Sequence, residues 1–93
     1  FSRQLKALGN KGDCLIALST SGNSANIIEA VKVALESDIF TICLLGKKGG
    51  NLKDLCDLPI IIPSDTTARI QEAHIFIGHI ICEGIELALN LRA

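Results

Sequence analysis

Three short apolar runs alternate with helical patterns along this chain, and that order constrains the fold more than any other feature. The runs are "CLIAL" at 14–18, "IFTICLL" at 39–45 and "LPIIIP" at 58–63. Short apolar runs without polar alternation are typical of strands in a parallel sheet that is covered on both faces. We therefore expect three buried strands.

Helical patterns separate and follow these runs. Residues 1–8 predict the end of a helix that stops at Gly9, and residues 25–37 predict an amphipathic helix. Residues 51–56 predict a short helix, and a long one runs from Thr67 to about Asn90. Alternation of this kind gives parallel strands joined by right-handed crossovers. The prediction is an α/β three-layer sandwich with a parallel sheet, of the doubly wound, flavodoxin-like kind.

The last predicted helix is apolar around most of its circumference. A helix of this kind must be buried on nearly all sides, whereas a sheet covers only one of them. We therefore expect a partner subunit to cover the rest, in a homo-oligomer that we predict to be a tetramer. Its apolar residues are Ile70, Ala73, Ile75, Phe76, Ile77, Ile80, Ile81, Cys82, Ile85, Leu87 and Leu89.

Composition excludes several functional classes. The net charge is −1 with scattered Lys and Arg, so bulk charge attracts neither nucleic acid nor an anionic membrane. The sequence has no signal peptide pattern and no apolar run near the ~20 residues of a membrane span. The four cysteines form no CxxC pair, which excludes a zinc ribbon and favours reduced core thiols in a cytoplasmic protein. The chain contains no Met and begins with Phe1, which indicates a piece of a longer protein.

A cluster of small polar residues, "STSGNS" at 19–24, stands where the first strand meets the following helix. Ligands of open parallel sheets bind beyond the carboxyl ends of the strands. Hydroxyls both donate and accept hydrogen bonds, Gly22 allows a tight turn, and the N–H groups of a helix start attract anions. We predict a phosphate-binding loop. The alternative is an elaborate helix cap made by Asn23 or Ser24.

Three segments carry a resemblance to a known family. They are "STSGNSANIIEAVKVA", "LLGKKGGNLKDLCD" and "ARIQEAHIFIGHIICEGIE". Together they resemble the sugar-isomerase (SIS) fold and, within it, the C-terminal half of the sedoheptulose 7-phosphate isomerases, or phosphoheptose isomerases. The resemblance extends from residue 1 to about residue 86. It implies that residues 1–93 are the C-terminal part of a single SIS domain, whose N-terminal part is absent from this chain.

The resemblance also implies an activity and a set of site residues. The activity is a phosphosugar aldose–ketose isomerisation, from sedoheptulose 7-phosphate to D-glycero-D-manno-heptose 7-phosphate, in heptose biosynthesis for lipopolysaccharide. His79 is implied as the acid/base, Gln71 and His79 as ligands of one zinc per subunit, and Ala68 replaces an acidic residue of some relatives. A His and a Glu of the family's site lie upstream of this chain. The implied substrate- and phosphate-binding residues are Ser19, Thr20, Ser21, Ser24 and Gln71.

Other interpretations remain open at this stage. A histidine such as His79 on an apolar helix is more often a hydrogen-bonded core residue than a ligand, and we expect His74 to be a packing residue. Gln71 and His79 are eight residues apart, a rise of about 12 Å, which is a long reach for one metal. Lys47 and Lys48 fit a solvated turn. The rival function is a non-catalytic SIS module that binds a sugar phosphate or a protein partner, as one relative does with a replication initiator.

Overall fold

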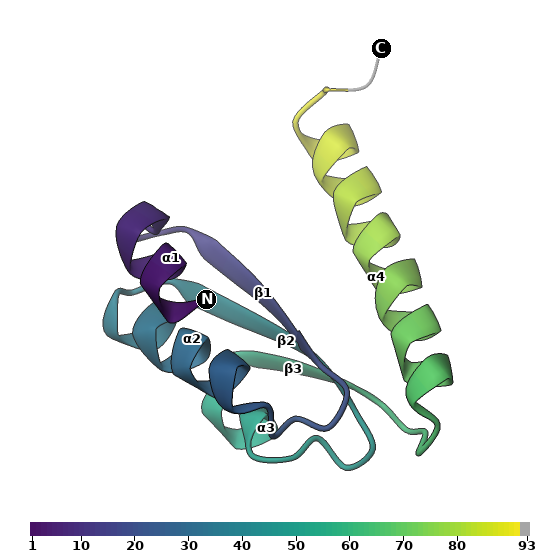
Figure 1. The fold of residues 1–93 in the computed structure, drawn as a ribbon. Coiled ribbons are helices and arrows are strands. Elements are labelled where there is room, and N and C mark those ends of the chain that lie inside the picture. Colours follow the sequence, from purple (N-terminus) through teal and green to yellow (C-terminus); the bar gives the residue numbers. More distant parts are fainter. Residues whose placement is uncertain (92–93) are drawn as a thin grey trace.

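A computed structural model describes residues 1–91 of the chain as a three-stranded parallel sheet with helices on both faces (Figure 1). The predicted α/β class and the order of strands and helices are confirmed. Helix and strand ends differ from the predicted bounds by one or two residues. The elements are α1 (Ser2–Leu8), β1 (Cys14–Ser19), α2 (Ala25–Glu36), β2 (Phe40–Gly46), α3 (Leu52–Leu55), β3 (Leu58–Ile62) and α4 (Thr67–Ala88).

The strands lie in the order β1-β2-β3, so each strand pairs with its neighbour in sequence. Ser19 lies opposite Leu45 in the first pair, and Gly46 lies opposite Ile62 in the second. All three strands run in the same direction, and their carboxyl ends therefore meet at one edge of the sheet. The loops that leave this edge lead into α2, α3 and α4.

One face of the sheet carries the hydrophobic core. Ala17, Cys43 and Leu45 pack there against Val31 of α2 and Leu52 of α3. These sheet residues share one face because side chains alternate along a strand and the register aligns them. Figure 1 shows α1, α2 and α3 on this side of the sheet.

Among residues 1–91, only α4 covers the opposite face, and it covers part of it. Leu44 is fully buried there, and a Cβ on Gly46 would lie 2.5 Å from the side chain of Ile70. Elsewhere the face is open, since Leu18 and Phe40 are about half exposed. The prediction of strands covered on both faces is therefore wrong for this chain, because α4 is fully buried only at Ile70 and His74.

A side-chain link fixes the beginning of β2 to the beginning of β3. Asp57 accepts hydrogen bonds from the backbone N–H of Thr41 at 2.8 Å and from its hydroxyl at 3.0 Å. The Thr41 hydroxyl in turn accepts the N–H of Asp57 at 2.8 Å. These bonds satisfy a buried hydroxyl in the sheet, since Thr41 is fully buried.

No helix within residues 1–91 is both long enough and apolar enough to cross a membrane.

Candidate functional site

The serine-rich loop leaves the carboxyl end of β1 and closes on itself before α2. Ser19 is the last residue of β1 and Ser24 precedes the first residue of α2; their Oγ atoms lie 2.7 Å apart. The hydroxyl of Ser19 also accepts the N–H of Gly22 at 3.1 Å. Gly22 has φ +73°, a left-handed conformation that favours glycine. The loop is thus a compact turn whose hydroxyls lie close together at the edge of the sheet.

The side chains of this loop do not cap α2, so the alternative of an elaborate helix cap is wrong. Ser24 occupies the cap position but makes no side-chain hydrogen bond to the helix. The side-chain oxygen of Asn23 instead accepts the N–H of Asn51 at 2.8 Å. Within residues 1–91 the backbone N–H groups of Ser24 and Ala25 have no acceptor. They stand at the positive end of the α2 dipole, where an anion binds favourably.

A second loop packs against the serine-rich loop from the end of β2. The N–H of Leu52 donates to the carbonyl oxygen of Gly22 at 3.0 Å. A Cβ on Gly22 would overlap the carbonyl of Gly49, so the close approach that glycine permits here is to this neighbouring loop. Lys47 and Lys48, within the turn, are exposed as the sequence predicts.

The two histidines of α4 lie in different environments. His74 is 3% exposed, and its Nε2 atom lies 2.8 Å from the carbonyl oxygen of Leu45, which confirms it as a packing residue. His79 is exposed, so it is not a core histidine in this chain. At about 100° per residue, His79 lies about 140° around the helix from His74 and points away from the sheet.

The structure shows no side-chain hydrogen bond between the implied α4 residues and the serine-rich loop. Gln71 and His79 are both exposed, and neither side chain has a hydrogen-bond partner among residues 1–91. His79 lines a groove on α4 of about 450 Å³ together with Glu83 and four other residues. Its direction away from the sheet means that α4 does not bring His79 to the serine-rich loop of the same chain.

Gln71 and His79 do not form a zinc site by themselves. Within residues 1–91 no group of three or more His, Cys, Asp or Glu side chains could hold a metal ion. The two residues supply at most two ligands, and the helix separates them by a rise of about 12 Å. A tetrahedral zinc centre needs four ligands, of which at least three come from protein in known catalytic sites.

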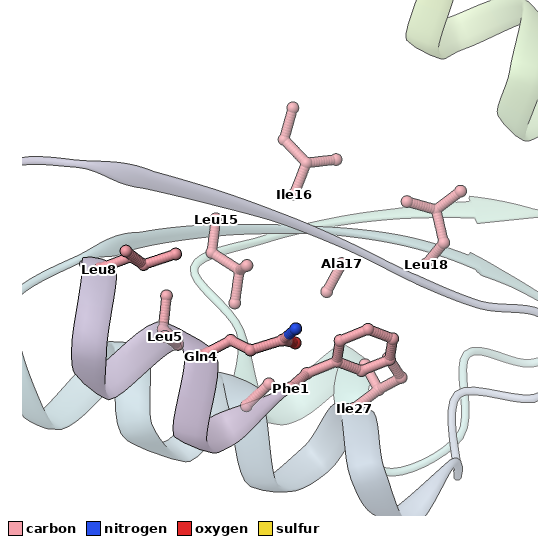
Figure 2. Close-up of a pocket in the computed structure, with 10 residues that line it drawn as sticks. Phe1, Gln4, Leu5, Leu8, Leu15, Ile16, Ala17, Leu18 and Ile27 are labelled. Carbon is pink, nitrogen blue, oxygen red and sulfur yellow. The ribbon is translucent and has the colours of Figure 1, made fainter.

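An apolar groove of about 470 Å³ lies along β1, away from these polar residues. Figure 2 shows Leu15 and Ala17 pointing from β1 toward Phe1, Leu5 and Ile27, whereas Ile16 points to the opposite face. Gln4 is the one polar residue that lines it. A groove of this composition suits apolar side chains rather than a phosphosugar, so we do not assign it to the active site.

Comparisons with known proteins agree with this arrangement. Residues 1–46, which include α1, β1, the serine-rich loop and α2, match the SIS domain. The chain is 56% identical over 89 residues to a phosphoheptose isomerase from Clostridium acetobutylicum, covering 96% of this chain and 45% of that protein. The chain belongs to the SIS domain family. A phosphoheptose isomerase from Trichlorobacter lovleyi is 53% identical over 89 residues, with the same coverage.

Solved structures extend the likeness of this SIS chain to three dimensions. A phosphoheptose isomerase from Neisseria gonorrhoeae superposes with a TM-score of 0.88 at 49% identity, covering 91% of this chain and 49% of that one. One from Francisella tularensis gives 0.86 at 41% identity, covering 89% and 45%. The chain thus spans about half the length of the relatives it matches, within a fold that it shares with them.

The contact between the serine-rich loop and the turn before α3 is not predicted by the sequence. The sequence predicts Asn23 as a possible helix cap and the turn as solvated, yet hydrogen bonds join the two loops. The sequence signal for this contact is the glycine pair Gly49 and Gly50, shortly after the second strand. Both glycines adopt positive φ in the structure. Such a pair indicates a tight backbone contact.

Proposed function

We propose that the protein containing this chain is a phosphosugar aldose–ketose isomerase that converts sedoheptulose 7-phosphate to D-glycero-D-manno-heptose 7-phosphate in the cytoplasm. The observation that carries the proposal is the compact serine-rich loop, with free N–H groups of Ser24 and Ala25 at the start of α2. The similarity of the chain to the relatives named above, which are phosphoheptose isomerases, also supports the proposal.

The loop is proposed to hold the phosphate of the substrate. The hydroxyls of Ser19, Thr20, Ser21 and Ser24, with the free N–H groups, supply donors for a dianion without a fixed cation. The Ser21 hydroxyl accepts the N–H of Asn23 at 3.1 Å, which leaves its own O–H free to donate to an anion.

His79 is proposed to move a proton during isomerisation. The reaction takes a proton from one carbon and returns it to the neighbouring carbon through an enediol, while another proton moves between the oxygens. An imidazole nitrogen of His79 can accept and return one of these protons near neutral pH. The second proton carrier is the Glu that the resemblance implies in the upstream part of the domain.

His79 lies on the side of α4 that is directed away from the sheet. Since it points away from the sheet of its own chain, we propose that Gln71 and His79 work with groups from outside this chain, across an interface of a homotetramer. Gln71 and His79 would supply two ligands of the zinc implied by the resemblance, and the remaining ligands would come from those other groups. No step of the proton transfer above goes through the metal.

The test is isomerisation of sedoheptulose 7-phosphate by the purified full-length protein, followed by separation of the ketose and aldose phosphates. Formation of the heptose 7-phosphate supports the proposal. A protein that binds the sugar phosphate without converting it would instead favour the non-catalytic SIS module. That alternative has no observation of its own in this chain, since the relatives named above are isomerases.

A further inference from the structure

The serine-rich loop and the turn before α3 are held together by two independent hydrogen bonds. The side-chain oxygen of Asn23 accepts the N–H of Asn51 at 2.8 Å. The carbonyl oxygen of Gly22, one residue earlier, accepts the N–H of Leu52 at 3.0 Å. Two adjacent acceptors on one loop therefore meet two adjacent donors on the other, which fixes both the distance and the relative rotation of the loops.

The backbones of the two loops also touch, so the contact has no room for side chains. A Cβ on Gly50 would lie 2.5 Å from the carbonyl oxygen of Ser21 and 2.6 Å from the carbonyl carbon of Gly22. A Cβ on Gly46 would lie 2.8 Å from the carbonyl oxygen of Thr20. Residues 20–22 are thus in contact with residues 46–50 along their main chain, and a displacement of either loop displaces the other.

We propose that Asn23 and the Gly49–Gly50 turn act as positioning residues, which hold the serine-rich loop in the conformation that receives the phosphate. The inference rests on the proposed function of that loop. Asn23 acts through the loop, because its side-chain oxygen is directed to Asn51 of the neighbouring turn. Without these contacts between the loops, binding would have to order the hydroxyls and N–H groups that converge on the anion. The cost of that ordering weakens affinity.

The first variant that tests the inference is Asn23→Ala in the full-length protein, with Asn26→Ala as its matched control. Both asparagines are exposed, but the Asn26 side chain accepts the N–H of Ile27 in its own helix at 2.9 Å and makes no hydrogen bond to another loop within residues 1–91. We expect Asn23→Ala to raise KM for the sugar phosphate and Kd for inorganic phosphate about threefold to tenfold, the value of one hydrogen bond. We expect kcat to change less than twofold, and Asn26→Ala to leave all three constants unchanged.

A second pair separates positioning from general destabilisation. Gly50→Ala places a methyl group against Ser21, whereas Gly12→Ala, also at a positive φ, meets nothing within 4 Å. Both variants carry the strain of a left-handed alanine, so Gly12→Ala measures that strain alone, and Gly50→Ala adds a clash with backbone atoms that should lower the melting temperature further. Only Gly50→Ala should raise Kd for inorganic phosphate, by about tenfold or more, because only it pushes on the phosphate loop.

The outcomes distinguish this inference from the proposed function. Equal phosphate affinities for Asn23→Ala and Asn26→Ala in an active enzyme would overturn the positioning role and leave the isomerase proposal intact. Weakened phosphate binding in Asn23→Ala, in a protein that isomerises no seven-carbon phosphosugar, would support the positioning role and remove the proposed activity. A wild-type protein that binds no phosphate would overturn both.

Discussion

The Nε2 atom of His74 lies 2.8 Å from the carbonyl oxygen of Leu45, and this bond joins the long helix α4 to the central strand of the sheet. His74→Ala in the full-length protein should remove this bond to the carbonyl oxygen of a buried strand residue. We expect a loss of about 1–3 kcal/mol in the free energy of unfolding. Turnover per folded molecule should be preserved, and thermal denaturation beside an activity assay measures both.

His79, on the far side of the same helix, should behave in the opposite way. His79→Ala should reduce turnover by about 10²–10⁴, the usual contribution of a positioned acid or base, with little change in melting temperature. The physical reason is its exposure, which leaves no packing to lose in the isolated chain. His79→Gln is the companion variant, since it keeps a polar group but cannot carry the proton. Full activity in both variants would remove His79 from the mechanism.

The hydroxyls of the serine-rich loop should contribute to substrate affinity. Ser19→Ala, Ser21→Ala or Ser24→Ala should each raise KM for the phosphosugar about tenfold or more, because a hydrogen bond to a charged group is worth about 1.5–3 kcal/mol. Steady-state kinetics with the full-length protein measure the effect. Ser2→Ala is the control, since Ser2 lies in α1. Unchanged KM in all three loop variants would contradict the phosphate-binding role.

The exposed apolar face of α4 should lie in a subunit interface. Ile75 is 61% exposed, Phe76 67% and Ile80 55%, and such a face on a monomer is larger than soluble proteins usually tolerate. We expect sedimentation of the full-length protein to give a homotetramer. Phe76→Glu should shift it toward smaller species, whereas Lys32→Glu on the exposed side of α2 should not. A stable wild-type monomer at micromolar concentration would count against the interface.

The thiol of Cys43 should make stability fall at alkaline pH. Burial, with a smaller contribution from the neighbouring thiol of Cys56, raises the pKa of Cys43 from its ordinary value of 9.0 to about 12. Between these values the unfolded chain loses the proton while the folded chain retains it, so the unfolded state binds fewer protons and stability decreases with pH. Below pH 9 the contribution is fully present.

Denaturation curves of wild type and Cys43→Ala between pH 8 and pH 11 measure this effect. The variant is less stable throughout because it leaves a cavity, but its stability should fall less steeply above pH 9. In the native protein, a thiol reagent at pH 8 should spare Cys43, which is buried. Parallel alkaline slopes for the two proteins would contradict the assigned pKa.

Local patterns were sufficient to predict the order of the elements. The spacing of apolar residues in α2 and the apolar run of β3, with Pro59 near its start and Pro63 just after its end, are properties of neighbours in sequence, and the predicted elements are confirmed. The degree of burial was not predictable, because an apolar strand looks the same whether its cover belongs to this chain or lies outside it. Leu18 is accordingly half exposed.

Contacts between distant residues could not be predicted either. Asn23 and Asn51 are 28 residues apart, and Thr41 and Asp57 are 16 apart. Each pair meets only because adjacent strands bring successive loops to the same edge of the sheet, and the choice of partner depends on side-chain geometry there. The serine-rich loop was visible in the sequence, whereas its contact with the turn before α3 was not.

The buried residues of α4 are Ile70 and His74, so the helix is anchored to the sheet near its N-terminal end. Ala88 lies fourteen residues beyond His74, about 21 Å along the axis, whereas His79 lies only about 7.5 Å along it. A tilt of about 5° about His74 therefore moves the end of the helix by about 2 Å and the backbone at His79 by about 0.7 Å. A subunit that packs against the outer end of α4 and tilts the helix about His74 would therefore displace His79 only about a third as far as Ala88.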